Sequence, residues 1–153
     1  MKKILSIAVI LFTLLSCSSD DSNSRNSDTY IKFTINGTNY NFRDIITAES
    51  GAITINGNNG TLTNPGDTQL TLWLPLMLSN GTFDVDDSFE NPYQISFDSQ
   101  ALNFDFDFAE LGTITITQST GDYIKGTFTA TITNSNDQTI NITNGEFKAY
   151  SME

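Results

Sequence analysis

Apolar and polar residues alternate over much of the chain after residue 29, and this alternation restricts the fold more than any other sequence feature. It is clearest on both sides of Asn36-Gly37, in residues 30–35 and 38–42. An Asn-Gly pair between two alternating runs is the strongest short-range signal of a β-hairpin with a two-residue type I′ turn. The turn predicts three cross-strand pairs: Ile35 with Thr38, Phe33 with Tyr40, and Ile31 with Phe42. All apolar side chains of the hairpin then lie on one face, so the turn and the pattern predict the same register.

Further alternating segments predict further strands. They cover residues 53–55, 68–76, 83–85, 93–97, 103–108, 114–116, 124–132 and 140–149. We expect Leu76 to share the inward face of Leu74, and both Phe106 and Phe108 to share the face of Phe104. No window of eleven residues in this part of the chain has a helical period. About 8–10 short strands predict an all-β fold, an antiparallel β-sandwich with an up-and-down lipocalin-like barrel as the alternative.

The last predicted strand changes the parity of its inward-facing residues between Ile142 and Phe147. One extra residue in this strand restores the inward face. We therefore expect a β-bulge near Asn144-Gly145, with the glycine at positive φ.

The N-terminal segment has the composition of a bacterial export signal. Lys2 and Lys3 precede the apolar run of residues 4–15, which is too short to span a bilayer. Small polar residues follow at once around Cys17, which is the single cysteine of the chain. We expect residues 1–16 to be a cleaved signal peptide, and Cys17 to be lipidated instead of remaining a free thiol.

Leu14-Leu15-Ser16-Cys17 resembles the lipobox of bacterial lipoproteins, and the acidic residues that follow resemble the tethers of Bacteroidota-type lipoproteins. This resemblance implies diacylation of Cys17 and a lipid-anchored protein at the cell outer membrane, exposed at the cell surface. The later strands resemble a family of uncharacterised Bacteroidota lipoprotein domains, for which no activity is established. The resemblance rests on these segments: Thr34-Ile35-Asn36-Gly37-Thr38, Gly81-Thr82-Phe83, Gly112-Thr113-Ile114-Thr115-Ile116, Lys125-Gly126-Thr127-Phe128 and Ile142-Thr143-Asn144-Gly145-Glu146-Phe147. One departure is Tyr40, near which the family often has a tryptophan.

These boundaries divide the chain into four parts. The parts are a signal peptide (1–16), a flexible polar tether (17–28), a β-sandwich domain (29–150) and a short tail (151–153). Removal of the signal would leave five basic against eighteen acidic side chains, a net charge of −13. Such a chain repels nucleic acid, and we expect no basic patch on its surface. Because the chain has no histidine and no cysteine besides Cys17, thiol and Ser-His catalysis and Cys/His zinc sites are excluded.

The densest acidic cluster consists of Asp84, Asp86, Asp87 and Glu90. Calcium takes six to eight oxygen ligands, and carboxylates at this spacing on a loop supply several of them. The EF-hand pattern is incomplete because Phe89 stands where it needs glycine. The alternative is a solvated acidic hairpin tip. Apart from this calcium hypothesis, we expect no cofactor.

Trp73 lies opposite the leucine row of its strand, so we expect an exposed indole that stacks on a sugar ring. Tyr93, Asp98 and Asp105 are the residues that would extend such a site. The alternative is that both faces of this strand are buried and that Trp73 belongs to a second core layer. Asp105 and Asp107 together suggest the carboxylate pair of a glycosidase, but alternate carboxylates are also the ordinary polar face of a strand.

We therefore expect a non-enzymatic binding or accessory module, anchored to the membrane through Cys17, with a glycan or an envelope protein as partner. The alternatives are a carboxylate-based glycosidase and a purely structural envelope component. Exposed aromatic side chains around Trp73 with Asp98 or Asp105 would favour sugar binding. A wholly polar surface would favour the structural class, and a phenylalanine-lined barrel cavity would favour an apolar ligand.

Overall fold

The structure is a computed structural model that describes residues 28–61 and 63–152. The expected signal peptide, the lipidation site Cys17 and all of the expected tether except Asp28 lie outside the described residues. Within the described part of the chain, no helix has the length and apolar character needed to cross a membrane.

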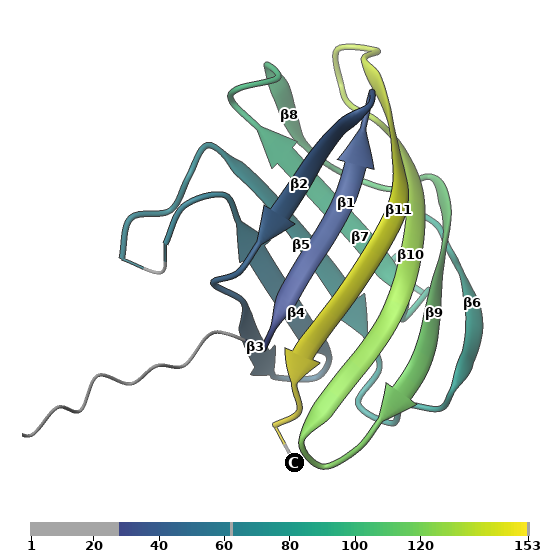
Figure 1. The fold of residues 1–153 in the computed structure, drawn as a ribbon. Coiled ribbons are helices and arrows are strands. Elements are labelled where there is room, and N and C mark those ends of the chain that lie inside the picture. Colours follow the sequence, from purple (N-terminus) through teal and green to yellow (C-terminus); the bar gives the residue numbers. More distant parts are fainter. Residues whose placement is uncertain (1–27, 62, 153) are drawn as a thin grey trace, which may run out of the picture.

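The fold is all-β, as the alternation predicts. Two antiparallel sheets face one another in the manner of a β-sandwich (Figure 1). The strands are β1 (Tyr30–Ile35), β2 (Thr38–Phe42), β3 (Ile46–Glu49), β4 (Ile53–Asn58), β5 (Thr68–Leu74), β6 (Gly81–Val85), β7 (Gln94–Ser99), β8 (Phe104–Phe108), β9 (Leu111–Ser119), β10 (Tyr123–Thr133) and β11 (Thr139–Tyr150). The six-stranded sheet has the order β2-β1-β11-β10-β9-β6, and the five-stranded sheet has the order β3-β4-β5-β7-β8. Because the ladders form two sheets, the alternative of a single lipocalin-like barrel is wrong.

The first hairpin has the predicted register. Ile35 pairs with Thr38, Phe33 with Tyr40, and Ile31 with Phe42. Asn36 and Gly37 have φ angles of 49° and 80°. Positive φ at both central residues is what a type I′ turn requires, so the local Asn-Gly signal determines this turn.

The predicted β-bulge is present in β11, but its geometry corrects one expectation. Thr143 and Asn144 together lie opposite Thr129 of β10, which restores the inward face. Asn144 has a φ of 53°, whereas Gly145 is not among the residues with positive φ. Gly145 is needed for a different reason, because a Cβ there would lie 2.6 Å from Cγ of Phe128. Asparagine is one of the few residues that adopt the left-handed conformation at low cost.

The core lies between the two sheets, and Phe33 is at its centre. Its ring centroid lies 5.2 Å from that of Phe42, 6.2 Å from that of Phe97 and 6.3 Å from that of Phe128. Phe97 belongs to the five-stranded sheet, and the other rings belong to the six-stranded sheet. Edge-on and tilted aromatic contacts of this kind therefore join the two layers.

Two segments differ from the pattern-based prediction. The leucine row ends with β5 at Leu74, and Leu76 lies beyond the strand with 44% of its surface exposed. Asn56-Gly57 lies inside β4 instead of ending it, and Gly57 pairs with Leu70. A Cβ at Gly57 would lie within 3.0 Å of Ile31 and Phe42, so this glycine gives the opposite sheet room to pack.

Candidate functional site

Four aromatic side chains form a connected group on the outer side of the five-stranded sheet, and we call this group the aromatic surface. Its members are Trp73, Phe89, Phe106 and Phe108. Phe108 is central, with ring centroids 5.3 Å from Phe106, 6.3 Å from Trp73 and 6.4 Å from Phe89. The aromatic surface thus joins β5, β8 and the connection between β6 and β7.

A bulge in β8 puts two of these rings on the outside, which corrects the expected inward row of phenylalanines. Phe104 pairs with Ser99 and is buried, whereas Phe108 pairs with Ser96 on the opposite face of the sheet. The register shifts by one residue between these pairs, which exchanges the two faces of the strand. Phe106 is consequently 57% exposed.

Trp73 projects from the outer face of β5 and is half-buried. Its indole Nε1–H donates a hydrogen bond of 3.4 Å to Oγ of Ser96, which lies buried on the same face of β7. The indole therefore covers the neighbouring strand and keeps an edge in solvent. This arrangement lies between the two expectations, since Trp73 is neither fully exposed nor part of a second core layer.

The exposed edge of Trp73 borders a groove of about 440 Å³. Its walls come from the turn at Gly51 and Ala52, from residues 74–77, and from Phe89, Asn91, Pro92 and Gln94. Two of its side chains are almost fully exposed, Phe89 at 92% and Met77 at 90%. Contiguous exposed apolar side chains of this size commonly mark an interaction surface.

The polar side chains of this groove already have partners within the protein. The Asn91 side-chain amide donates to the carbonyl oxygen of Asp84 at 3.0 Å, and its Oδ1 accepts the Tyr93 backbone N–H at 2.9 Å. Nε2 of Gln94 donates to the carbonyl oxygen of Ser88 at 2.9 Å. Because these amides fix the loop from Asp84 to Gln94, the groove offers a ligand mainly apolar contact.

The other end of the aromatic surface is polar. Phe106 borders a hollow of about 350 Å³ together with Asp98 and Asp105, so the structure brings both predicted carboxylates to one exposed ring. Burial raises the pKa of the Asp98 carboxyl. Oδ2 of Asp105 accepts a hydrogen bond of 2.7 Å from Nδ2 of Asn136. An exposed ring beside carboxylates offers a sugar both a flat apolar face and hydrogen-bond acceptors.

Tyr93 does not extend the aromatic surface, which corrects the sequence-based expectation. Its side chain is buried and stacks on Phe83, with ring centroids 4.1 Å apart and planes inclined by 5°. The same burial raises the pKa of its hydroxyl group. Tyr93 is therefore a packing residue between the two sheets.

The acidic residues proposed for calcium lie in and after β6. Oδ1 of Asp86 accepts the backbone N–H of Ser88 at 2.9 Å, which shapes the turn before Phe89. Among the described residues, no three acidic side chains come close enough together to hold a metal ion. Calcium binding at Asp84, Asp86, Asp87 and Glu90 stays a prediction.

Sequence reasoning missed Phe89 and Met77 as surface residues. Phe89 stands alone between acidic and polar residues of a loop, and an isolated ring in such a loop has no strand to carry it inward. This polar loop context indicates that the Phe89 ring is exposed. The exposure of Phe106 and Phe108 depends on the bulge in β8, for which the sequence has no glycine and no parity change.

Comparisons of the chain with protein-family models, with curated proteins and with solved structures found no match.

Proposed function

We propose that this chain is a membrane-anchored lipoprotein of the cell envelope whose β-domain is a binding module without catalytic activity. Its aromatic surface holds an apolar segment of a partner protein. The observation that supports this proposal is the connected group of Trp73, Phe89, Phe106 and Phe108 beside the nearly fully exposed Met77.

The exposure of Phe89 and Met77 argues against a structural role for them. Side chains that are about nine-tenths exposed bury little apolar area and add little to folding. Covering each of them would contribute roughly 1.5–3 kcal/mol, which corresponds to about a 10- to 150-fold change in affinity. Aromatic side chains and methionine are also enriched at the centres of protein interfaces.

An apolar partner fits this end of the site better than a sugar does. A sugar needs hydrogen-bond partners at the surface, whereas the amides of Asn91 and Gln94 are engaged within the loop. Leu76 and Pro75 extend the groove with further apolar surface. The groove therefore matches a short apolar stretch of polypeptide that packs between Trp73 and Phe89.

The anchoring half of the proposal rests on the N-terminal signal and on Cys17. Radiolabelled palmitate should enter the wild-type protein in cells and should be absent from Cys17→Ala. Labelling that persists in Cys17→Ala would contradict the anchor.

The binding half is tested by photo-crosslinking in the native cells. A photoreactive amino acid at position 89 should give one dominant crosslinked envelope protein, and Met77→Asp in the same chain should abolish it. The matched control carries the photoreactive residue at Thr127, an exposed position on the opposite sheet. Equal crosslinking from positions 89 and 127, or a product that Met77→Asp leaves unchanged, would contradict the proposal.

A glycan at the Phe106 end is a second candidate function, favoured by the hollow that Phe106 shares with Asp98 and Asp105. Binding in a glycan screen should be lost in Phe106→Ala and retained in Phe89→Ala. Release of sugar in the same assay, abolished by Asp98→Asn, would instead indicate the glycosidase. A screen with no binding sugar would leave the protein partner as the sole candidate.

A further inference from the structure

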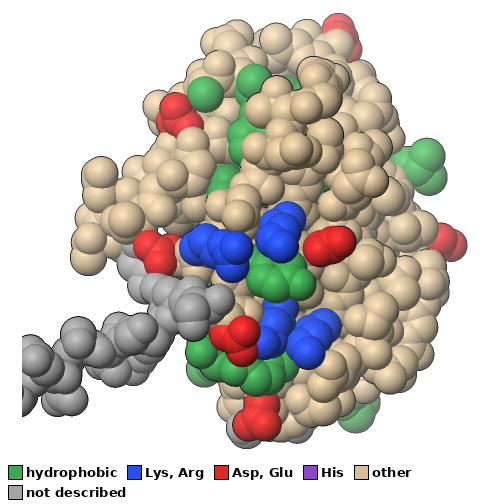
Figure 2. Space-filling view, viewed as in Figure 1, with side chains coloured by type: hydrophobic (Ala, Val, Ile, Leu, Met, Phe, Trp, Pro, Cys, Tyr) green, Lys and Arg blue, Asp and Glu red, His purple; other side chains and the backbone are tan. Residues whose placement is uncertain are grey.

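Every basic side chain in the described part of the chain lies on or beside the outer face of the six-stranded sheet (Figure 2). They surround two half-buried tyrosines, Tyr30 and Tyr123, and the exposed Tyr150, and we call this surface the lysine–tyrosine face. It consists of Tyr30, Lys32, Arg43, Tyr123, Lys125, Lys148 and Tyr150. The strand register therefore collects the few described cations of an acidic chain in one place, together with the carboxylates of Asp28 and Glu146.

Cross-strand pairing builds this face. Lys148 of β11 pairs with Tyr30 of β1 on one side and with Lys125 of β10 on the other. The Lys32 ammonium lies 4.3 Å from the ring centroid of Tyr30, and the Lys148 ammonium lies 4.0 Å from that of Tyr123. Two lysines directly opposite one another repel, so this face is stabilised by any anion that lies between them.

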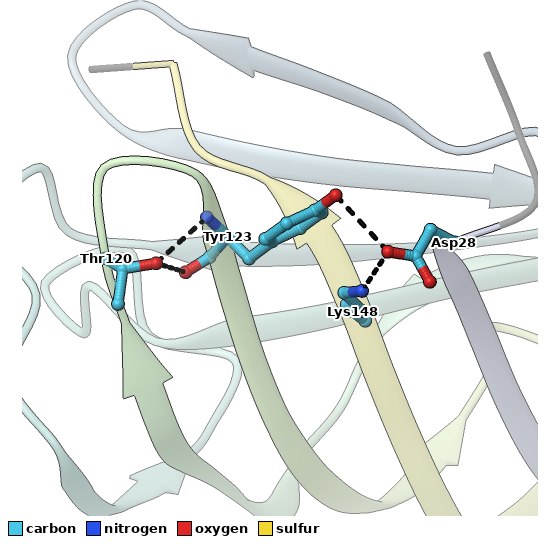
Figure 3. A network of polar contacts seen from close by, with 4 residues as sticks. All are labelled: Asp28, Thr120, Tyr123 and Lys148. Carbon is cyan, nitrogen blue, oxygen red and sulfur yellow. Dashed lines mark hydrogen bonds and ion pairs between the residues drawn. The ribbon is translucent and has the colours of Figure 1, made fainter.

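One anion from the chain itself already occupies part of the face (Figure 3). Oδ2 of Asp28 lies 2.5 Å from Nζ of Lys148 and accepts a 3.3 Å hydrogen bond from the Tyr123 hydroxyl. The ammonium group lowers the pKa of the Asp28 carboxyl, and the carboxylate raises the pKa of Lys148. Glu146 is a second carboxylate on this face, because it is exposed on β11 and pairs with Lys32 across the strands. The face therefore holds four basic side chains against the carboxylates of Asp28 and Glu146.

Asp28 is also where the described chain begins, eleven residues after Cys17. Eleven residues span at most about 40 Å, which limits the distance between Asp28 and Cys17. If Cys17 carries lipid, the lysine–tyrosine face is the side of the domain from which the chain leads to the membrane.

Charge is distributed very unequally between this face and the rest of the domain. The described residues include four basic and fifteen acidic side chains, since Lys2, Lys3, Arg25, Asp20, Asp21 and Glu153 fall outside them. All four basic side chains belong to the lysine–tyrosine face, together with Asp28 and Glu146, so the remaining described surface carries thirteen acidic side chains and no basic one. An anionic membrane repels that remainder and attracts the lysine–tyrosine face.

We propose that the lysine–tyrosine face lies against the phosphate-bearing headgroups of the membrane and binds them. This rests on the proposed lipid anchor and goes beyond it, because it assigns a headgroup-binding surface and an orientation. A weak interaction between this face and the headgroups is sufficient, because a lipid anchor at Cys17 would hold the domain at the membrane. A short linker of this kind gives an effective concentration in the millimolar range. Tyrosines suit the membrane–water boundary because the ring is apolar and the hydroxyl is polar. The aromatic surface, on the opposite sheet, then points away from the membrane.

The test uses the full chain, acylated at Cys17 and reconstituted into vesicles of phosphatidylcholine with or without phosphatidylglycerol. A fluorophore is attached to one introduced thiol, at Thr127→Cys beside Lys125 or at Gln69→Cys on the opposite sheet. Quenching by a headgroup-attached nitroxide should rise severalfold at position 127 when phosphatidylglycerol is present, and salt should reverse it. Position 69 should change little. The double variant Lys32→Gln/Lys125→Gln should lose most of the dependence on phosphatidylglycerol while keeping its thermal midpoint.

Flotation of the chain with pure phosphatidylcholine vesicles reports the anchor alone, so failure of the anchor and failure of the orientation are distinguishable. Equal quenching at positions 127 and 69, or quenching that ignores lipid charge, would overturn the proposal. Quenching at position 127 that appears only after Asp20→Asn and Asp21→Asn would assign the face to the acidic segment of the chain and would also overturn it. A signal that depends on protein density in the vesicle would assign the face to a second copy, with the same consequence.

Discussion

The bulge in β11 separates two roles that the sequence places in adjacent residues, and substitution tests this separation directly. Asn144 has the left-handed backbone, with a φ of 53°, whereas Gly145 has the close contact. A methyl group at Gly145 would lie 2.6 Å from Cγ of Phe128 and closer still to the Phe128 carbonyl oxygen. That carbonyl belongs to the β10–β11 ladder and cannot move without breaking it.

The expected costs follow from these contacts. Overpacking against backbone costs about 1–3 kcal/mol, so we expect Gly145→Ala to lose about 3 kcal/mol of unfolding free energy. For a domain of this size the thermal midpoint falls by about 10 °C. Asn144→Gly should change stability by less than about 0.5 kcal/mol, because glycine adopts the same φ freely, whereas Asn144→Ala should cost about 1 kcal/mol.

Urea unfolding followed by circular dichroism measures these differences, with Gly121→Ala as the matched control. Gly121 has no atom within 4 Å of its added Cβ and no positive φ, so this variant should unfold like the wild type. If Gly145→Ala is as stable as Gly121→Ala while Asn144→Gly is destabilised, the assignment of the two roles is refuted.

Three further predictions concern the two sheet surfaces. Tyr93→Ala should lose about 3 kcal/mol because it empties a stacked core position, whereas Phe89→Ala should change the unfolding free energy by less than about 0.5 kcal/mol; equal losses in urea unfolding would contradict the division between packing and surface rings. Asp98 has a raised pKa, so ionisation of its carboxyl opposes folding. Asp98→Asn should therefore be more stable than the wild type at pH 7. This difference in stability should vanish as the pH falls below about 3.9, where the carboxyl of the wild type is protonated in both the folded and the unfolded state. Asp28 has a lowered pKa in the folded protein, so its carboxylate stabilises the fold above about pH 3.9, and this stabilisation is lost as the pH falls through the pKa of the folded state. Asp28→Asn should therefore make the thermal midpoint fall less steeply at acid pH. An unchanged dependence of the midpoint on acid pH would count against the ion pair with Lys148.

The sequence predicts local pairing well where two signals coincide. The first hairpin combines an Asn-Gly turn with alternating apolar residues, and each requires the same register. The β11 bulge is likewise visible as a parity change between Ile142 and Phe147. Its internal geometry is not visible, because asparagine and glycine both tolerate positive φ and only packing against Phe128 decides between them.

The candidate site is less predictable because it depends on contacts between distant segments. Asp98, Asp105 and Trp73 do lie on one side of one sheet, as strand parity indicates. Tyr93 is in phase with the buried Ile95 and Phe97, so strand parity indicates an inward position, and Phe83 of the other sheet stacks on it. The β8 bulge reverses the facing of Phe106 and Phe108, and alternation alone gives no sign of it.

The distribution of charge shows the same limit. Net charge correctly describes an acidic protein, but it does not show that Lys125 and Lys148, far apart in the chain, become directly opposed. Sheet order brings Tyr30 beside them from the other end of the domain. Surfaces that are built across strands therefore require the topology before their chemistry can be read.

Trp73 offers the most direct measurement of the central claim, because it is the single tryptophan of the chain and it borders the proposed docking groove. The partner isolated by crosslinking at position 89 is titrated into the protein while the indole emission is recorded. We predict a blue shift, protection from acrylamide quenching, and at least a tenfold weaker affinity for Phe89→Ala. Saturable binding with unchanged Trp73 emission and unchanged affinity of Phe89→Ala would contradict the aromatic surface as the binding site.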